Sequence, residues 1–300
     1  MKALRPLVGT WATRGGIAFM KVLAIFPLSV TRALGVLLGG VLYVLVVPRR
    51  RVVQANFALC FPLWSAAERH QYTRLMFVHF AQAWLDRAWL WHAPEKWVAR
   101  RVTLSGALDE LEGTTPTVFF LPHFVGLDAA WAGVALRVHR LSTTIYTDQS
   151  NKLVDQWILK GRQRFGKLRL FGRAEGVKPI VTALREGQPL YLLPDMDFGP
   201  GDSVFVPFYG LPTATVTSLS RFARLGRAKV VPLLPRLTRG GYEVEVLPAW
   251  GDFPTDDPVA DTALMNQRLQ DYIATMPTQY YWVHKRFKTR PAGDASVYSD

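Results

Sequence analysis

Two side chains that could move a proton lie five positions apart in the segment His123-Phe-Val-Gly-Leu-Asp128. They follow the apolar run 117–121, which is typical of a buried strand. Positions five apart on a regular helix point about 140° away from each other, so the pair can meet only if His123 lies in the turn before a helix and Asp128 in its first turn. Pro122 and Gly126 favour such a break. We therefore predict that Asp128 orients the imidazole of His123.

A carboxylate that holds one imidazole nitrogen leaves the other nitrogen able to accept a proton. In serine hydrolases this arrangement activates a serine of the protein. Here the Gly-x-Ser-x-Gly pattern is absent, so capping or packing is the better interpretation of Ser218 and Ser220. The predicted pair would instead activate a hydroxyl of the substrate. Because the spacing alone also arises by chance, the prediction needs support from other residues.

The elements that must position this pair can be predicted from periodicity and turn residues. Residues 52–92 have apolar positions at helical spacing. Beyond residue 103 we expect strands at 117–121, 142–146, 190–193, 229–234 and 242–247, and helices at 126–138, 153–165, 178–185, 215–225 and 261–276. This alternation predicts an α/β fold with a mixed, largely parallel sheet flanked by helices.

Four blocks in order along the chain resemble the H-x4-D glycerolipid and lysophospholipid acyltransferases, and within them the bacterial lipid A secondary (late) acyltransferases. The blocks are the His123–Asp128 segment, Phe171-Gly172-Arg173, Leu193-Pro-Asp-Met-Asp-Phe-Gly199 and Val230-Val-Pro-Leu-Leu234. The segments 161–166, 202–208 and 280–288 are similar to the lipid A subgroup as well. Many lipid A members carry Glu where this chain has Asp128, and the Pro-Glu-Gly-Thr sequence of glycerolipid members is absent.

The resemblance implies roles for further residues. Arg173 falls on the arginine that binds substrate phosphate, and Arg164 is a second candidate for binding the substrate. Both guanidinium groups suit bidentate contact with phosphate, or could stabilise the oxyanion of a thioester carbonyl. Asp195 and Asp197 follow a strand and could bind sugar hydroxyls of the substrate or support an arginine. The basic residues after His284 could meet lipid phosphates or form a solvated surface.

The N-terminal part of the chain predicts contact with a membrane. Residues 33–47 are apolar and are followed by Arg49, Arg50 and Arg51, with no acidic residue before Glu68. A spanning helix needs about 20 apolar residues, so a tilted span that includes part of 22–32, a monotopic or re-entrant anchor and a core helix all remain open. Arginines beside the apolar run would meet anionic head groups on the cytoplasmic face. We expect an anchoring segment at 1–51, an acyltransferase domain at 52–291 and a flexible tail at 292–300.

The net charge of +13 favours an anionic partner, and the single Cys60 fits a reducing compartment and forms no metal-type cluster. The resemblance implies transfer of a fatty acyl chain from acyl carrier protein to a phosphorylated glycolipid, at the 3-hydroxyl of an existing acyl chain, on the cytoplasmic face of the bacterial inner membrane. It implies no metal and no redox cofactor. Two alternatives stay open: another lipid acceptor, or a non-catalytic basic protein that binds membranes. Nucleic acid is disfavoured because no recognised binding motif is present.

Overall fold

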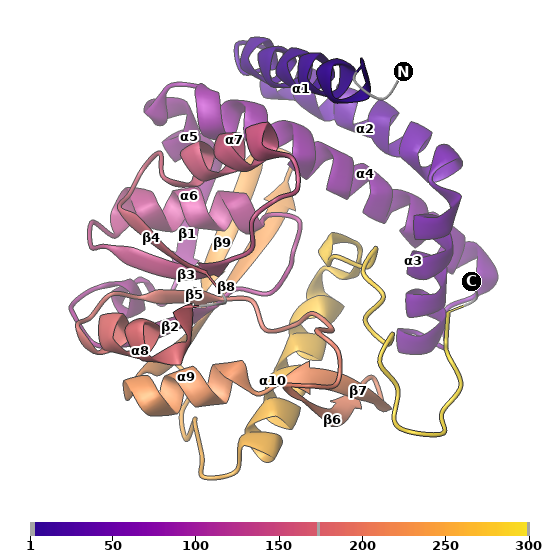
Figure 1. The fold of residues 1–300 in the computed structure, drawn as a ribbon. Coiled ribbons are helices and arrows are strands. Elements are labelled where there is room, and N and C mark those ends of the chain that lie inside the picture. Colours follow the sequence, from indigo (N-terminus) through magenta and orange to yellow (C-terminus); the bar gives the residue numbers. More distant parts are fainter. Residues whose placement is uncertain (1–3, 173–174, 299–300) are drawn as a thin grey trace.

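A seven-stranded sheet forms the centre of the fold in the computed structural model, which describes residues 4–172 and 175–298 (Figure 1). Its strand order is β1-β9-β8-β2-β5-β3-β4, and every neighbouring pair is parallel except β8 and β9. The strands are β1 (Val102–Gly106), β2 (Thr117–Phe120), β3 (Ser142–Tyr146), β4 (Leu168–Gly172), β5 (Leu190–Leu192), β8 (Lys229–Thr238) and β9 (Gly241–Val246). The predicted α/β fold with a mixed, largely parallel sheet is therefore confirmed.

Helices cover both faces of this sheet, so its central strands are buried on both sides. Val118 and Phe120 of β2 face one core, and Phe119 faces the other. One face is covered by α4 (Ala66–His92), α5 (Glu95–Arg101), α6 (Leu127–Arg137) and α7 (Lys152–Arg162). The opposite face is covered by α8 (Val177–Arg185), α9 (Ser218–Gly226) and α10 (Pro258–Thr275), beside the hairpin of β6 (Ser203–Phe208) and β7 (Leu211–Val216). Short 3₁₀ turns occupy Leu108–Leu111 and Pro277–Gln279.

Three N-terminal helices form a layer outside α4, as Figure 1 shows. They are α1 (Leu4–Leu23), α2 (Leu28–Leu45) and α3 (Val47–Cys60). The chain turns between α1 and α2, so no single helix runs through 22–45. Gly39 allows α2 to pack directly on α4, since an added Cβ would lie 2.5 Å from the Cα of Val78. The predicted helix over 52–92 is wrong in one respect: α3 ends at Cys60, and a Ser65–Glu68 capping box starts α4.

The C-terminal segment runs back along the core instead of leaving it. Tyr298 is buried, its hydroxyl donates to Asn56 Oδ1 at 2.6 Å, and the amide of Phe287 donates to that hydroxyl at 3.1 Å. Within the expected flexible tail, Tyr298 is thus anchored by its buried side chain, whereas residues 292–296 are exposed. The predicted helix over 215–225 also starts too early, since residues up to Val216 belong to β7.

Candidate active site

His123 lies in the turn that joins β2 to α6, at the carboxyl edge of the parallel strands. The segment after α10 fixes this turn: the amide of Val125 donates to the carbonyl of Gln279 at 2.7 Å, and the amide of Tyr281 donates to the carbonyl of His123 at 3.0 Å. Gly126, the residue before α6, allows the turn to approach β8, because an added Cβ would lie 2.8 Å from the Cβ of Pro235. The backbone that carries the imidazole is thus held by the segment after α10 and by β8.

The carboxylate that holds His123 is Asp195, which follows β5. Oδ1 of Asp195 lies 2.8 Å from Nδ1 of His123, and Oδ2 accepts the His123 amide at 2.9 Å and the Tyr280 hydroxyl at 3.0 Å. Burial opposes ionisation of Asp195, but His123 and these hydrogen bonds outweigh it and lower the pKa of the carboxyl group. An ionised Asp195 accepts the proton on Nδ1, which leaves Nε2 as the nitrogen that can accept another proton.

The register of the sheet explains this pairing. β2 and β5 are adjacent and parallel, with Val118 opposite Leu190 and Phe120 opposite Leu192. His123 and Asp195 have the same separation of 72 residues as these strand partners. Each lies three positions past the last residue of its strand. The two side chains therefore meet because both chains continue in register beyond the edge of the sheet.

Asp128 does not orient His123, so that part of the prediction is wrong. Its carboxylate is buried and points instead to α4 and α7: Oδ2 accepts Nε of Arg87 at 2.8 Å, and Oδ1 accepts Nε of Arg162 at 2.8 Å. Burial opposes ionisation of Asp128, but the two guanidinium groups lower the pKa of this carboxyl group. The physical reason is that two fixed cations, Arg87 and Arg162, each bind one oxygen of this carboxylate through a charge-assisted hydrogen bond.

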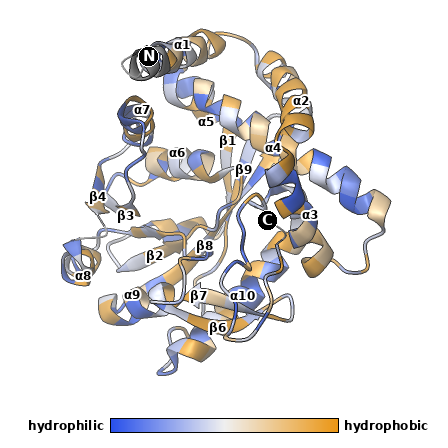
Figure 2. Ribbon diagram, turned by 45° about the vertical axis from the view of Figure 1, so that its right-hand side comes forward, coloured by the Kyte–Doolittle hydropathy of each residue, from blue (hydrophilic) through white to orange (hydrophobic). Residues whose placement is uncertain are grey.

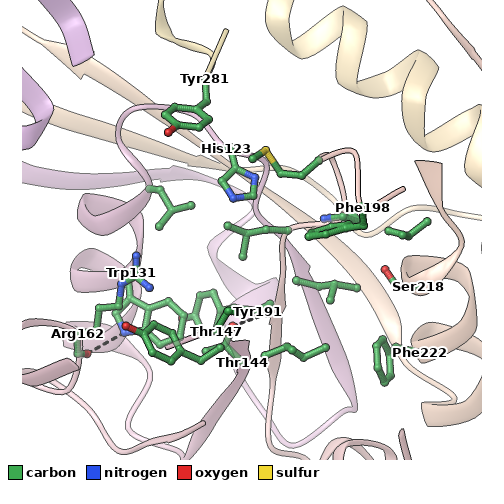
Figure 3. A pocket seen from close by; sticks show the side chains of 18 of the residues that line it. His123, Trp131, Thr144, Thr147, Arg162, Tyr191, Phe198, Ser218, Phe222 and Tyr281 are labelled. Atoms are coloured by element: carbon green, nitrogen blue, oxygen red, sulfur yellow. Dashed lines mark hydrogen bonds between the residues drawn. The ribbon is translucent and has the colours of Figure 1, made fainter. Parts of the chain in front are cut away.

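A cavity of about 930 Å³ opens beside His123 at this edge of the sheet (Figure 3). Ligand sites in α/β folds commonly lie at this edge. Apolar and aromatic side chains supply much of the lining, while Arg87 and Arg162 contribute positive charge. Within residues 4–172 and 175–298 there is no group of three His, Cys, Asp or Glu side chains placed to hold a metal ion.

Comparisons with known proteins identify the family of this chain. The sequence model for "Bacterial lipid A biosynthesis acyltransferase" matches residues 2–289. This chain belongs to that family. A lipid A biosynthesis acyltransferase of Haemophilus influenzae is 32% identical over 295 residues, covering 95% of this chain and 90% of the relative. The lipid A biosynthesis lauroyltransferase of Escherichia coli is 30% identical over 294 residues, covering 96% and 95%, and its myristoyltransferase is 32% identical over 299 residues, covering 96% and 90%.

Among solved structures, the 1-acyl-sn-glycerophosphate acyltransferase of Thermotoga maritima is similar with a TM-score of 0.37 and 12% identity. The match covers 81% of this chain and 95% of that chain.

Arg164 is not placed to bind substrate in this family member. Its guanidinium donates to the carbonyl oxygen of Leu90 at 3.0 Å and to that of Ala93, and lies over the ring of Phe165. These bonds satisfy carbonyl groups at the C-terminal end of α4, where such groups lack helical partners. Arg162, two residues earlier, is the arginine of this segment that lines the cavity. Arg173 lies outside the described residues.

Asp197 stabilises the loop behind the site. Its carboxylate accepts the amide and hydroxyl of Thr289 at 2.7 and 2.8 Å and the amide of Gly199 at 2.9 Å, while its own amide donates to Nε2 of His284. The predicted contact with a substrate sugar is therefore not what this geometry favours. Burial and then Arg286 lower the pKa of His284 to about 4, so this imidazole is neutral at pH 7.

The basic cluster after His284 is only partly a surface feature. Arg286 is buried and donates to the carbonyl of Ala214 and the hydroxyl of Thr215, both at 2.7 Å.

Arg87 and Arg162 line the cavity but were not predicted from the sequence. For Arg162 a signal was available, since it falls within the segment 161–166 that resembles the lipid A subgroup. For Arg87 there was no such signal, because it lies in the long helix α4, outside the segments that resemble the family.

Proposed function

We propose that this family member transfers a fatty acyl chain from acyl carrier protein to the 3-hydroxyl of an acyl chain on a phosphorylated lipid A precursor. The observation that carries the proposal is the His123–Asp195 pair at the wall of a large, mostly apolar cavity. An imidazole held in this way suits deprotonation of an alcohol, and the cavity suits hydrocarbon chains.

In the proposed reaction, Nε2 of His123 removes the proton of the acceptor hydroxyl as its oxygen attacks the thioester carbonyl. The carbon–sulfur bond then breaks, a new ester carbon–oxygen bond remains, and the proton passes from His123 to the departing thiolate. Asp195 keeps the proton on Nδ1 and stabilises the imidazolium that forms transiently. The reaction is balanced without an added oxidant or reductant.

Arg87 and Arg162 are proposed to bind negative charge at the other side of the cavity. Asp128 holds both guanidinium groups, at 2.7–2.8 Å, and the three side chains together carry one net positive charge. Such a fixed cationic cluster suits a phosphate of the acceptor or the oxyanion that develops on the thioester carbonyl. Asp128 would then matter to the reaction by positioning arginines.

The donor is proposed to be acyl carrier protein because the chain carries a net charge of +13, which suits an acidic protein partner. The test is to incubate the purified protein with acyl carrier protein thioesters or coenzyme A thioesters, and with a lipid A precursor, a lysophospholipid or an ornithine lipid. We expect one acyl group to be added to the lipid A precursor from the carrier protein, measured by mass spectrometry. Preferred transfer to another lipid would contradict the acceptor, and equal use of coenzyme A thioesters would contradict the donor.

The protein is proposed to lie on the cytoplasmic face of the inner membrane through α1 and α2. Most of the exposed large apolar side chains of the described residues lie between positions 11 and 45, and Figure 2 shows the apolar character of α2. By length and composition alone, α2 could cross a membrane, with 22% of it buried. It packs along α4, however, which carries Arg69, Arg74 and Arg87. Because spanning would draw these charges into hydrocarbon, a monotopic anchor is the better proposal.

The double variant Leu37→Ser/Leu45→Ser should bind vesicles at least about 100-fold more weakly, because each leucine contributes roughly 1.5–3 kcal/mol when buried in an apolar phase. Both side chains are exposed on α2. Co-flotation with vesicles that contain anionic phospholipid measures the effect. Leu63→Ser/Val259→Ser is the matched control, since these residues are exposed and belong to neither α1 nor α2. Equal vesicle binding by both double variants would contradict the proposal that the exposed apolar side chains of α2 bind the membrane.

A further inference from the structure

A second cavity, of about 330 Å³, lies between the start of α2, the middle of α4 and the turn that joins β8 to β9. Its polar lining residues are Ser29, Arg32, His79, Gln82, Thr238 and Arg239. It shares no lining residue with the cavity beside His123. Along α4, His79 and Gln82 line the second cavity, whereas Phe80 and Trp84 line the first. The second cavity is therefore separate from the reaction site, on another side of α4.

The lining of the second cavity suits an anion. Arg32 and Arg239 carry positive charge, and no acidic side chain of the described residues lines the cavity. Burial lowers the pKa of His79, so its imidazole is neutral at pH 7 and adds no charge. Ser29 and Thr238 contribute hydroxyl groups, which can donate to an oxygen of a ligand. Two guanidinium groups with neighbouring hydroxyls are the chemistry that recognises a phosphate group.

Arg32 is fixed in position but keeps hydrogen-bond donors that the protein does not use. Its Nη2 lies 3.1 Å from Oδ2 of Asp86 and donates to the carbonyl of Gly241 at 3.0 Å. Asp86 also accepts Nε1 of Trp89 at 2.8 Å and the hydroxyl of Tyr242 at 2.7 Å, and it does not line the cavity. In the described part of the chain, Nε and Nη1 of Arg32 are buried and have no hydrogen-bond partner. Buried donors are normally paired, so these two nitrogens favour an acceptor from outside the chain.

The second cavity borders the apolar face that is proposed to contact the membrane. Ser29 is exposed at the start of α2, and the exposed Ile25, Phe26 and Val30 lie beside it in the sequence. Arg239 is exposed at the turn between β8 and β9. A lipid whose hydrocarbon contacts these apolar side chains can place its head group in the cavity, whereas a free anion would gain nothing from them.

We propose that the second cavity binds the phosphate group of an anionic phospholipid of the membrane, at a site distinct from the one where acyl transfer takes place. Arg32 and Arg239 supply the positive charge for this head group. Gln82 joins the two helices of the site, since its Nε2 donates to the carbonyl of Arg32 at 3.2 Å. A bound head group would therefore hold α2 against α4, the helix that also carries Arg87 into the reaction site. This inference rests on the proposed membrane contact and is independent of the proposed acyl transfer.

The test compares two variants of the lining with one control. Arg239→Ala changes an exposed turn residue, and Arg32→Lys keeps a cation beside Asp86 while it removes the guanidinium donors. Lys21→Ala is the control, because Lys21 is an exposed cation of α1 that lines neither cavity. The purified full-length proteins are floated with vesicles of phosphatidylcholine, with or without phosphatidylglycerol. The salt concentration is about 1 M, where the Debye length is about 3 Å and diffuse attraction to the charged surface is screened.

Phosphatidylglycerol should strengthen vesicle binding of the wild-type protein about 10-fold or more, the order expected for charge-assisted hydrogen bonds to one phosphate. Arg239→Ala and Arg32→Lys should each lose most of this gain and bind phosphatidylcholine vesicles as the wild-type protein does. Lys21→Ala should keep the gain within a factor of about 2, because a charge outside the cavity is screened.

Three results would overturn the proposal. The first is a wild-type protein that gains nothing from phosphatidylglycerol, and the second is an equal loss of the gain in Lys21→Ala and Arg239→Ala. The third concerns a free anion, tested by calorimetry with inorganic phosphate and no vesicles. If Arg239→Ala and Arg32→Lys lose binding of inorganic phosphate but keep the gain from phosphatidylglycerol, the cavity binds a free anion and not a lipid. A wild-type protein that binds neither kind of vesicle would contradict the proposed membrane contact, and this inference with it.

Discussion

Replacing His123 with alanine is expected to lower kcat for acyl transfer about 10⁴-fold, the upper end of what a positioned general base contributes. The variant loses the nitrogen that accepts the hydroxyl proton, while the cavity and the arginines remain. The side chain is 27% exposed and pairs with Asp195, so its removal should cost about 1–3 kcal/mol of unfolding free energy, the penalty of leaving a buried acceptor with one partner fewer. Steady-state transfer to the lipid A precursor and thermal unfolding measure the two effects.

His92→Ala provides the matched control for this prediction. His92 is also a half-buried histidine, and its Nε2 accepts a hydrogen bond from Nε1 of Trp157 at 2.9 Å. This variant should lose a similar amount of stability and keep its kcat within a factor of about 2–3. Comparable kcat values in His92→Ala and His123→Ala would mean that His123 acts through stability alone.

Replacing Asp195 with asparagine is expected to lower kcat about 10³–10⁴-fold with little change in KM. Asparagine keeps the size of the side chain, but it cannot accept the His123 amide, the His123 Nδ1 proton and the Tyr280 hydroxyl as an ionised carboxylate does. The equivalent change in the Ser-His-Asp triad lowers kcat about 10⁴-fold, because the imidazole adopts the wrong tautomer. The kinetic constants for the acceptor, measured at saturating donor, test this expectation.

Asp128→Asn is the informative comparison for Asp195→Asn, because both remove a buried carboxylate of the same size. Asp128 pairs with Arg87 and Arg162, so its loss should lower the free energy of unfolding by about 3–5 kcal/mol and raise the KM for the phosphorylated acceptor. A loss of kcat as large as that of Asp195→Asn, with unchanged stability and KM, would indicate that Asp128 orients the imidazole of His123.

Much of the sheet could be predicted from local patterns, and the errors have physical causes. The strands at 117–120, 142–146 and 190–192 are short, apolar or β-branched, and closed by turn residues, so their positions were correct. β4 was missed because Leu168–Gly172 includes Arg169 and pairs at the edge of the sheet, where burial does not impose an apolar pattern. The hairpin of β6 and β7 contains Pro207 and Pro212, which weaken a strand pattern.

In this site, closeness along the chain does not predict which side chains are in contact. His123 and Asp128 are close along the chain, and the sequence correctly placed them in a turn and in the first turn of a helix. The partner of His123 is 72 residues away, and its identity depends on β5 lying next to β2. The order of strands in a sheet is set by tertiary packing, which local periodicity does not report. The segment that contains Asp195 was recognised from its resemblance to the family, but its contact with His123 could not be predicted from that.

The most direct test of the account is the tautomer of His123, measured by ¹⁵N NMR at neutral pH on protein labelled in its histidine side chains, with His123→Ala to assign the signals. We predict that Nδ1 carries the proton and Nε2 does not, that Asp195→Asn changes both shifts, and that Asp128→Asn leaves them in place. A proton on Nε2 in the wild-type protein, or shifts that respond to Asp128→Asn and not to Asp195→Asn, would contradict the assignment of Asp195 as the carboxylate that orients the base.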